Sequence, residues 1–165
     1  MNNSNQPQYQ IPRDSKKPQN NTSANKTPKL KQPDPKFFQN VKENFASVAE
    51  QVMRKLCQEK IKLSASQLRN IFSLINDINF KIHQKGELDL EIQNDIKYLQ
   101  VRIYYACGKD SVPKGKDRGP VTIFVDESRI IELLLCVDSV EKWAIFSKYA
   151  EALVAFHKYY FGGKE

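Results

Sequence analysis

The stretch that decides the fold covers residues 63–82 and reads LSASQLRNIFSLINDINFKI. Ser64 precedes Gln67 by three residues, the spacing of a capping box at the start of a helix. The apolar residues recur at steps of three and four, which puts them on one helix face; they are Leu68, Ile71, Phe72, Ile75, Ile78 and Ile82. We therefore predict an amphipathic helix that opens at Ser64 and stops at Gly86.

Helical periodicity continues on both sides of this stretch. Asp34 and Pro35 suit an N-cap and a first helical position. Residues 121–125 are rich in β-branched side chains, but no second convincing strand exists to pair with them, so we assign them to a helix. In the last helix we expect Tyr159 on an apolar stripe. The fold class is all-α, a single bundle of about five helices over residues 34–60, 64–86, 89–108, 121–137 and 138–160.

Length and charge indicate the domain organisation. The chain has 165 residues, which suits one domain, and a formal net charge of +7. Residues 1–36 contain seven Lys or Arg against two Asp and carry +5, whereas residues 37–165 carry only +2. The first segment has too few apolar residues to offset the entropy of ordering. We predict a disordered basic arm over residues 1–36 and a helical bundle domain over residues 37–165.

The role of this arm stays open at the level of sequence. Its positive charge favours loose attachment to nucleic acid, yet the charge is dilute and also suits a leader that only keeps the chain in solution.

The composition offers little chemistry. The longest strongly apolar stretch, residues 130–137, is too short to span a membrane, and the polar start lacks an apolar signal core. The three cysteines lack a C-x-x-C pair, which argues against a zinc site. Within the helix that ends at Gly86, His83 has no Asp or Glu at a spacing that would make a metal or acid-base site. His157 lies among core-facing aromatic residues, and Gly115 is not part of a P-loop. We expect a cytoplasmic protein without membrane partner, enzyme activity, metal or cofactor.

Basic residues interleaved with aromatic ones are the remaining signal. A strip on the helix over residues 89–108 and just beyond it consists of Tyr98, Arg102, Tyr105 and Lys109. Cations meet phosphates and tyrosine rings offer stacking, so the strip suits a nucleic-acid surface. The alternative is that both tyrosines are second-layer core and Arg102 is an ordinary surface charge.

Two further groups suit contact with phosphate. Arg69 lies in the first turns of the helix that Ser64 opens, close to Ser66, and exposed N–H groups at a helix start attract phosphate. The loop from Lys109 to Pro120 is rich in turn residues and is basic, with Lys114, Lys116 and Arg118.

Three blocks of the sequence carry a family resemblance. They are residues 63–71 (LSASQLRNI), residues 98–109 (YLQVRIYYACGK) and residues 149–164 (YAEALVAFHKYYFGGK). In this order they resemble the small subunit of the type III-A CRISPR effector, the Csm complex. The last block is close to the C-terminal signature of that family.

The resemblance implies a non-catalytic all-helical subunit of antiviral defence, present in several copies. It would hold the duplex of guide RNA and target RNA through backbone contacts, with other Csm subunits and neighbouring copies of itself as partners. Carried over by position, the motifs mark Arg69, Lys109 and Lys148 as RNA-binding. Two departures stand out: Cys107 takes a place usually held by Ala, and Lys109 replaces an Arg and so lacks its bidentate grip on phosphate.

Two other functions remain as alternatives. A generic helical protein–protein interaction module without nucleic-acid binding would bury Tyr98, Arg102 and Tyr105 almost completely. A helix-turn-helix DNA binder is disfavoured, because the helix that follows Ser64 has few residues suited to reading bases.

Overall fold

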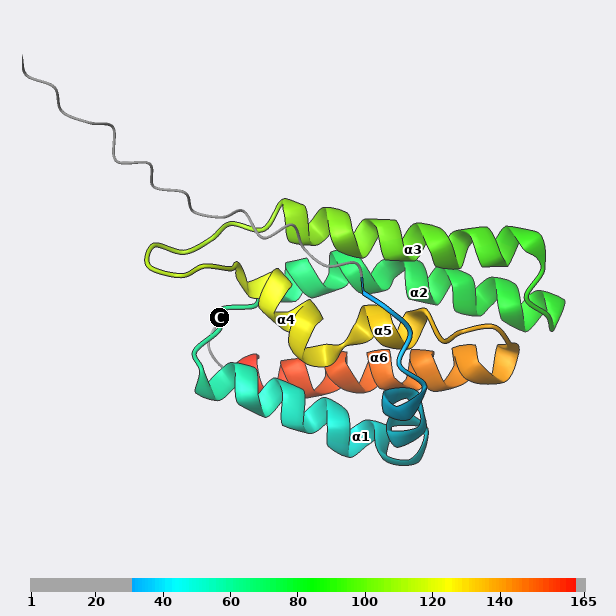
Figure 1. Cartoon of the computed structure of the whole chain (residues 1–165), viewed down its shortest axis with the longest axis horizontal. Coiled ribbons are helices and arrows are strands. Elements are labelled where there is room, and N and C mark those ends of the chain that lie inside the picture. Colours follow the sequence, from blue (N-terminus) through cyan, green and yellow to red (C-terminus); the bar gives the residue numbers. More distant parts are fainter. Residues whose placement is uncertain (1–30, 163–165) are drawn as a thin grey trace, which may run out of the picture.

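The computed structural model describes residues 31–162, and within this part of the chain it contains helices and no strand (Figure 1). The predicted all-α fold is confirmed. The six helices are α1 (Pro35–Gln58), α2 (Ala65–Lys85), α3 (Leu90–Gly108), α4 (Pro120–Ser128), α5 (Ile130–Leu134) and α6 (Val140–Phe161).

The helices pack around α6. Its most extensive contact is with α1, and it also packs against α2 and α5. Helices α2 and α3 form an antiparallel hairpin, in which α3 lies on the side of α2 that faces away from α6 (Figure 1). The centre of the core is aromatic: Trp143, Phe146 and Tyr149 of α6 are buried, and Phe124 of α4 is buried with them. Burying such large side chains contributes most to the stability of a bundle of this size.

Local sequence signals set most helix starts. The capping box at Ser64 is present, with Gln67 N donating to Ser64 Oγ and Ser64 N donating to Gln67 Oε1. Asp34 and Asp89 cap α1 and α3 through their side chains. The last helix begins slightly later than the predicted residue 138, because Ser139 is its N-cap and α6 starts at Val140.

The predicted helix over residues 121–137 is two helices. Arg129 stands between α4 and α5 with φ +52°, in the left-handed region. A non-glycine residue there costs roughly 1–2 kcal/mol, and tertiary contacts offset it: Arg129 Nη2 donates to Asp34 Oδ2 at 2.6 Å, and its guanidinium lies over the Phe37 ring. Tyr149 Oη also donates to Ser128 O at 2.8 Å. None of these partners is near in sequence, so periodicity alone missed the break.

The described chain begins at Lys31, within the predicted arm. Lys31 Nζ pairs with Asp126 Oδ1 at 2.8 Å and with Glu132 Oε1 at 3.3 Å, and α1 starts at Pro35. Residues 31–36 therefore belong to the folded bundle. The prediction of a disordered arm otherwise falls on residues 1–30, outside the described residues.

Candidate nucleic-acid interface

The two ends of the bundle are built differently. We call the end where α2 starts and α3 and α6 finish the loop end, and the opposite end of the α2–α3 hairpin, residues 81–95, the hairpin end (Figure 1). At the loop end the carbonyl of Leu63 is 2.8 Å from Nε2 of His157, which ties the start of α2 to the end of α6. The basic loop, residues 109–119, extends from this same end.

A partly buried hydrogen bond clamps the base of the basic loop. Asp110 Oδ2 accepts from Thr122 N at 2.9 Å and so caps the start of α4 across the loop. A Cβ atom at Gly119 would overlap the Asp110 carboxylate, so this closure requires glycine. Lys114 and Lys116 are exposed on the loop that this clamp holds.

Most of the predicted cations keep their charge available. Among residues 31–162, no ion pair involves Arg69, Arg102, Lys109, Lys114, Lys116 or Lys148. Arg118 differs, because its Nη1 lies 2.6 Å from Asp126 Oδ2. An unpaired cation attracts phosphate with its full charge, whereas Arg118 must first give up its carboxylate.

Three further cations at the loop end were not predicted from the sequence. Lys60 and Lys62 lie exposed in the linker before α2, and Lys158 lies exposed near the end of α6. None of the three forms an ion pair within the described chain. The linker lysines carried a weak signal, two charges next to a helix start, but only the packing of α6 on α2 brings Lys158 to the same end.

The serines at the start of α2 are not equivalent. Ser64 Oγ accepts from Gln67 N and lies 3.1 Å from both Gln67 Oε1 and Ser66 Oγ, so its hydroxyl serves the cap. Ser66 is exposed. Of this predicted pair, Ser66 offers the accessible hydroxyl.

The predicted strip on α3 is exposed but divided. Tyr98 and Tyr105 are 51% and 57% exposed, and Arg102 is half-buried, so these side chains are not core. Tyr105 lies at the loop end, with Lys109 Nζ 5.3 Å from its ring centre. Tyr98 instead lines a shallow hollow of about 390 Å³ with Phe80 and Lys81, towards the hairpin end.

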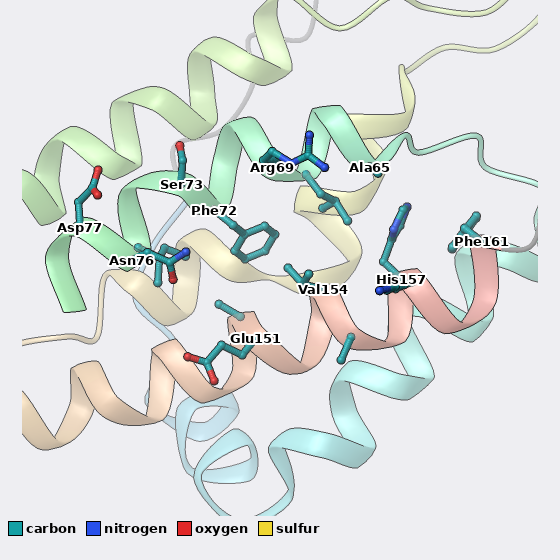
Figure 2. Close-up of a pocket in the computed structure, with 16 residues that line it drawn as sticks. Ala65, Arg69, Phe72, Ser73, Asn76, Asp77, Glu151, Val154, His157 and Phe161 are labelled. Atoms are coloured by element: carbon teal, nitrogen blue, oxygen red, sulfur yellow. The ribbon is translucent and has the colours of Figure 1, made fainter. Parts of the chain in front are cut away.

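An open groove of about 830 Å³ runs between α2 and α6 (Figure 2). Its floor is apolar, with Phe72 and Val154 facing each other, while Arg69 lies on the wall formed by α2. Two of the blocks that carry the family resemblance, residues 63–71 and 149–164, supply much of the lining. Lys148 does not line this groove, so the structure does not bring it together with Arg69 there.

The last turns of α6 do not match the predicted stripe. Tyr159 is 78% exposed, whereas the neighbouring Tyr160 is half-buried and donates to Glu50 Oε1 of α1 at 3.0 Å. That hydrogen bond raises the pKa of the Tyr160 hydroxyl above its usual value. Contact with α1 therefore decides which tyrosine faces inward.

The described residues contain no cluster of metal-binding side chains, and two of their cysteines have thiols that stay protonated. No group of three or more His, Cys, Asp or Glu within residues 31–162 is placed to bind a metal ion. Burial raises the pKa of the Cys107 and Cys136 thiols, which keeps them protonated at neutral pH. No helix of the described part is long and apolar enough to cross a membrane.

Comparison with known proteins gives independent evidence of the family to which the chain belongs. The family described as "Csm2 Type III-A" matches residues 39–163. A protein named "CRISPR system Cms protein Csm2" from Streptococcus thermophilus is 29% identical over 126 residues, which cover 74% of this chain and 95% of that protein. A protein of the same name from Enterococcus italicus is 26% identical over 103 residues, covering 59% of this chain and 68% of the relative. These matches confirm the resemblance carried by the three sequence blocks.

Proposed function

The chain belongs to the Csm2 type III-A family and is a small subunit of the type III-A CRISPR complex, and from this premise we propose that it binds RNA without catalysing a reaction. In this proposal several copies stand next to one another along the complex and hold the duplex of guide RNA and target RNA. Its partners are the two RNAs, other Csm subunits and neighbouring copies, in the cytoplasm.

The observation that supports RNA contact most directly is the set of unpaired cations at the loop end. Arg69, Lys109, Lys114 and Lys116 are exposed and have no carboxylate partner within the described chain. Cations of this kind bind phosphates of any sequence and release counterions when they do so. Such contact suits a subunit that holds many different guide sequences.

The absence of a catalytic role is part of the same proposal. His157, a buried histidine, has its Nε2 engaged at 2.8 Å by the carbonyl of Leu63, which leaves that nitrogen no substrate to act on. We therefore assign cleavage of nucleic acid in the complex to other subunits.

Exposed apolar side chains support the second half of the proposal, contact with protein. On α3, Leu90 is 71% exposed and Val101 is 58% exposed, which is unusual for large apolar residues. The generic interaction module is the second candidate function, although the exposure of Tyr98 and Tyr105 counts against the burial that it predicts. It predicts protein contact alone, whereas our proposal predicts RNA contact at the loop end as well.

A pair of matched double variants separates the two functions. Arg69→Glu with Lys109→Glu reverses two unpaired cations at the loop end, and Lys36→Glu with Lys42→Glu makes the same change of charge at the start of α1. In the assembled complex we expect the first variant to retain guide RNA less well than the second, measured by co-purified RNA per subunit. Equal retention by both variants would reject RNA contact at the loop end and favour the interaction module.

A further inference from the structure

The hollow between α2 and α3 carries exposed aromatic side chains. Its volume is about 390 Å³, and we call it the aromatic hollow because Phe80 of α2 and Tyr98 of α3 line it. These two side chains are 63% and 51% exposed. Leu74, which is half-buried, and Ile78, which is buried, belong to the same lining. Exposed apolar side chains that gather at one hollow, unlike single scattered ones, mark a surface for contact with another molecule.

The charges of the aromatic hollow disfavour RNA. Lys81 Nζ lies 2.7 Å from Asp95 Oδ2 and 2.7 Å from Glu91 Oε1, so carboxylates already neutralise the cation in the lining. Asp77 is exposed in the same lining and forms no ion pair within residues 31–162. The charge left for a ligand is therefore one carboxylate, which repels phosphate and attracts a cation.

The combination of exposed rings, aliphatic surface and one free carboxylate fits an arginine side chain. A guanidinium stacks on aromatic faces and donates paired N–H groups to a carboxylate, while its methylene stem covers apolar surface. Lysine fits less well, because its ammonium is a strongly hydrated point charge that does not stack. Arginine and aromatic residues are also the side chains that contribute most to binding at protein–protein interfaces.

A second copy of this chain has no suitable arginine in its described part. Arg54, Arg118 and Arg129 form ion pairs with carboxylates of their own chain. Arg102 is half-buried. Arg69 is exposed without an ion pair among the described residues, but it lies at the loop end, where we propose RNA contact. The arginine therefore comes from a different protein.

We propose that the aromatic hollow binds an arginine side chain presented by another protein subunit of the complex. The guanidinium stacks against the rings of Phe80 and Tyr98 and pairs with the Asp77 carboxylate. This inference goes beyond the proposed RNA contact and does not depend on it. It divides the predicted aromatic and basic strip on α3 by function: Tyr105 and Lys109 face RNA at the loop end, whereas Tyr98 faces protein.

Photo-crosslinking in the assembled complex identifies the occupant of the aromatic hollow. We would place p-benzoylphenylalanine at Phe80 in one protein and at Tyr105 in another, which replaces an exposed aromatic side chain in both. The expected result at Phe80 is an adduct with an arginine-containing peptide of another subunit. Adducts of Phe80 with RNA, with a second copy of this chain or with a peptide that lacks arginine would overturn the inference, as would the absence of an adduct. Failure of Tyr105 to label RNA would count against the proposed function alone.

A double-mutant cycle tests the pairing with Asp77. Asp77→Asn removes the free carboxylate, and Glu151→Gln is the matched control, because it removes an exposed carboxylate of α6 that lines the neighbouring groove but not the aromatic hollow. The crosslinked arginine of the partner is changed to glutamine. The measurement is the affinity of this chain for the complex assembled without it.

We expect Asp77→Asn and the arginine substitution each to weaken this affinity about 10-fold, and the two together to cost little more than the arginine substitution alone. Glu151→Gln should leave the affinity unchanged. Independent losses that multiply in the double variant, or an equal loss from Glu151→Gln, would reject the pairing.

Two tyrosine variants separate protein contact from RNA contact. Tyr98→Ala should weaken assembly about 10-fold and leave the affinity of the free full-length chain for single-stranded RNA unchanged, since the stacking partner of the guanidinium is lost. Tyr105→Ala is expected to weaken RNA binding and leave assembly unchanged. Loss of RNA affinity in Tyr98→Ala with unchanged assembly would assign Tyr98 to RNA and overturn the inference.

Discussion

The hairpin end and the loop end use the same residue types for opposite purposes. At the hairpin end Lys81 lies 2.7 Å from Glu91 and from Asp95, and Lys85 lies 2.7 Å from Asp89 and from Glu91. At the loop end Arg69, Lys109, Lys114 and Lys116 face solvent without ion pairs in the described chain, whereas Arg118 pairs with Asp126. The number of lysines does not show which of them form ion pairs within the fold and which stay free for a ligand. That depends on whether a carboxylate lies within reach of each lysine.

Each end also depends on a glycine, for a different reason. Gly86 at the hairpin end has φ +71° and open space where a Cβ would lie, so it supplies a backbone conformation. Gly119 at the loop end has an ordinary φ of −79°, and a Cβ there would meet the Asp110 carboxylate, so it supplies space. The glycine at the hairpin end is required by the local backbone conformation, whereas the glycine at the loop end is required because two segments approach each other closely.

The largest expected effect is on RNA affinity. Changing Lys109, Lys114 and Lys116 to Gln should weaken binding of single-stranded RNA roughly 10- to 100-fold at low salt and lower the salt slope by about 2, because three phosphate contacts are lost. Lys81→Gln with Lys85→Gln should leave affinity unchanged, since those charges are already neutralised. Fluorescence anisotropy over a range of salt concentrations measures the RNA affinity and the salt slope of both variants. A similar loss of affinity in the two variants would contradict the proposed difference between the loop end and the hairpin end.

Next in size is the cost of filling the space at Gly119. Gly119→Ala should lower the free energy of unfolding by about 1–3 kcal/mol, because it displaces Asp110 from its bond to Thr122 N. Asp110→Ala alone should cost about 1 kcal/mol through loss of the cap. In the background of Asp110→Ala, Gly119→Ala should add little. Urea unfolding measures all three variants, and strictly additive costs would contradict the close approach.

A smaller effect is expected at Gly86. Gly86→Ala should cost about 1 kcal/mol, because the added methyl group meets no neighbour and only the left-handed backbone resists it. Gly86→Asn should cost less, since asparagine tolerates this region better than alanine. If alanine and asparagine cost the same in urea unfolding, backbone strain is not the reason for the glycine.

The smallest expected effect is a dependence of the hairpin end on pH. The ion pairs lower the pKa of Asp89 and Glu91 and raise the pKa of Lys85. The carboxylates therefore stabilise the fold above their unfolded pKa, about 4, and this contribution fades as the pH falls through their lower folded values. The contribution of Lys85 is present below about pH 10 and is lost only as the pH rises through its raised value.

Thermal melts of the native chain and of Glu91→Gln measure this dependence. The native chain should melt at a slightly higher temperature at pH 7, and the gap should close towards pH 3 as Glu91 becomes protonated. The gap stays small because these groups are exposed and screened by solvent. A gap that widens in acid would contradict the assigned sign.

Sequence alone located the helices whose starts are local. Ser64 and Gln67 lie in one turn, so their reciprocal hydrogen bonds were readable without any tertiary contact, and the apolar face of α2 followed from spacing alone. The sequence also put Tyr98 and Tyr105 on one helix face, but it left open whether that face is buried or exposed. Residue spacing is the same for a second core layer and for a binding surface, and the structure shows that both side chains are exposed.

What remained was decided by contacts between distant residues. Arg129 breaks a periodic helix because Asp34 and Phe37 stabilise its left-handed backbone, and Arg118 loses its free charge because Asp126 lies within reach. The sequence determined the α-helical class and most helix starts, because these depend on interactions within a turn or two. Its composition also determined how many cations are present. Tertiary structure decided which cations stay unpaired and where they gather, because burial and pairing depend on helices that meet only after folding.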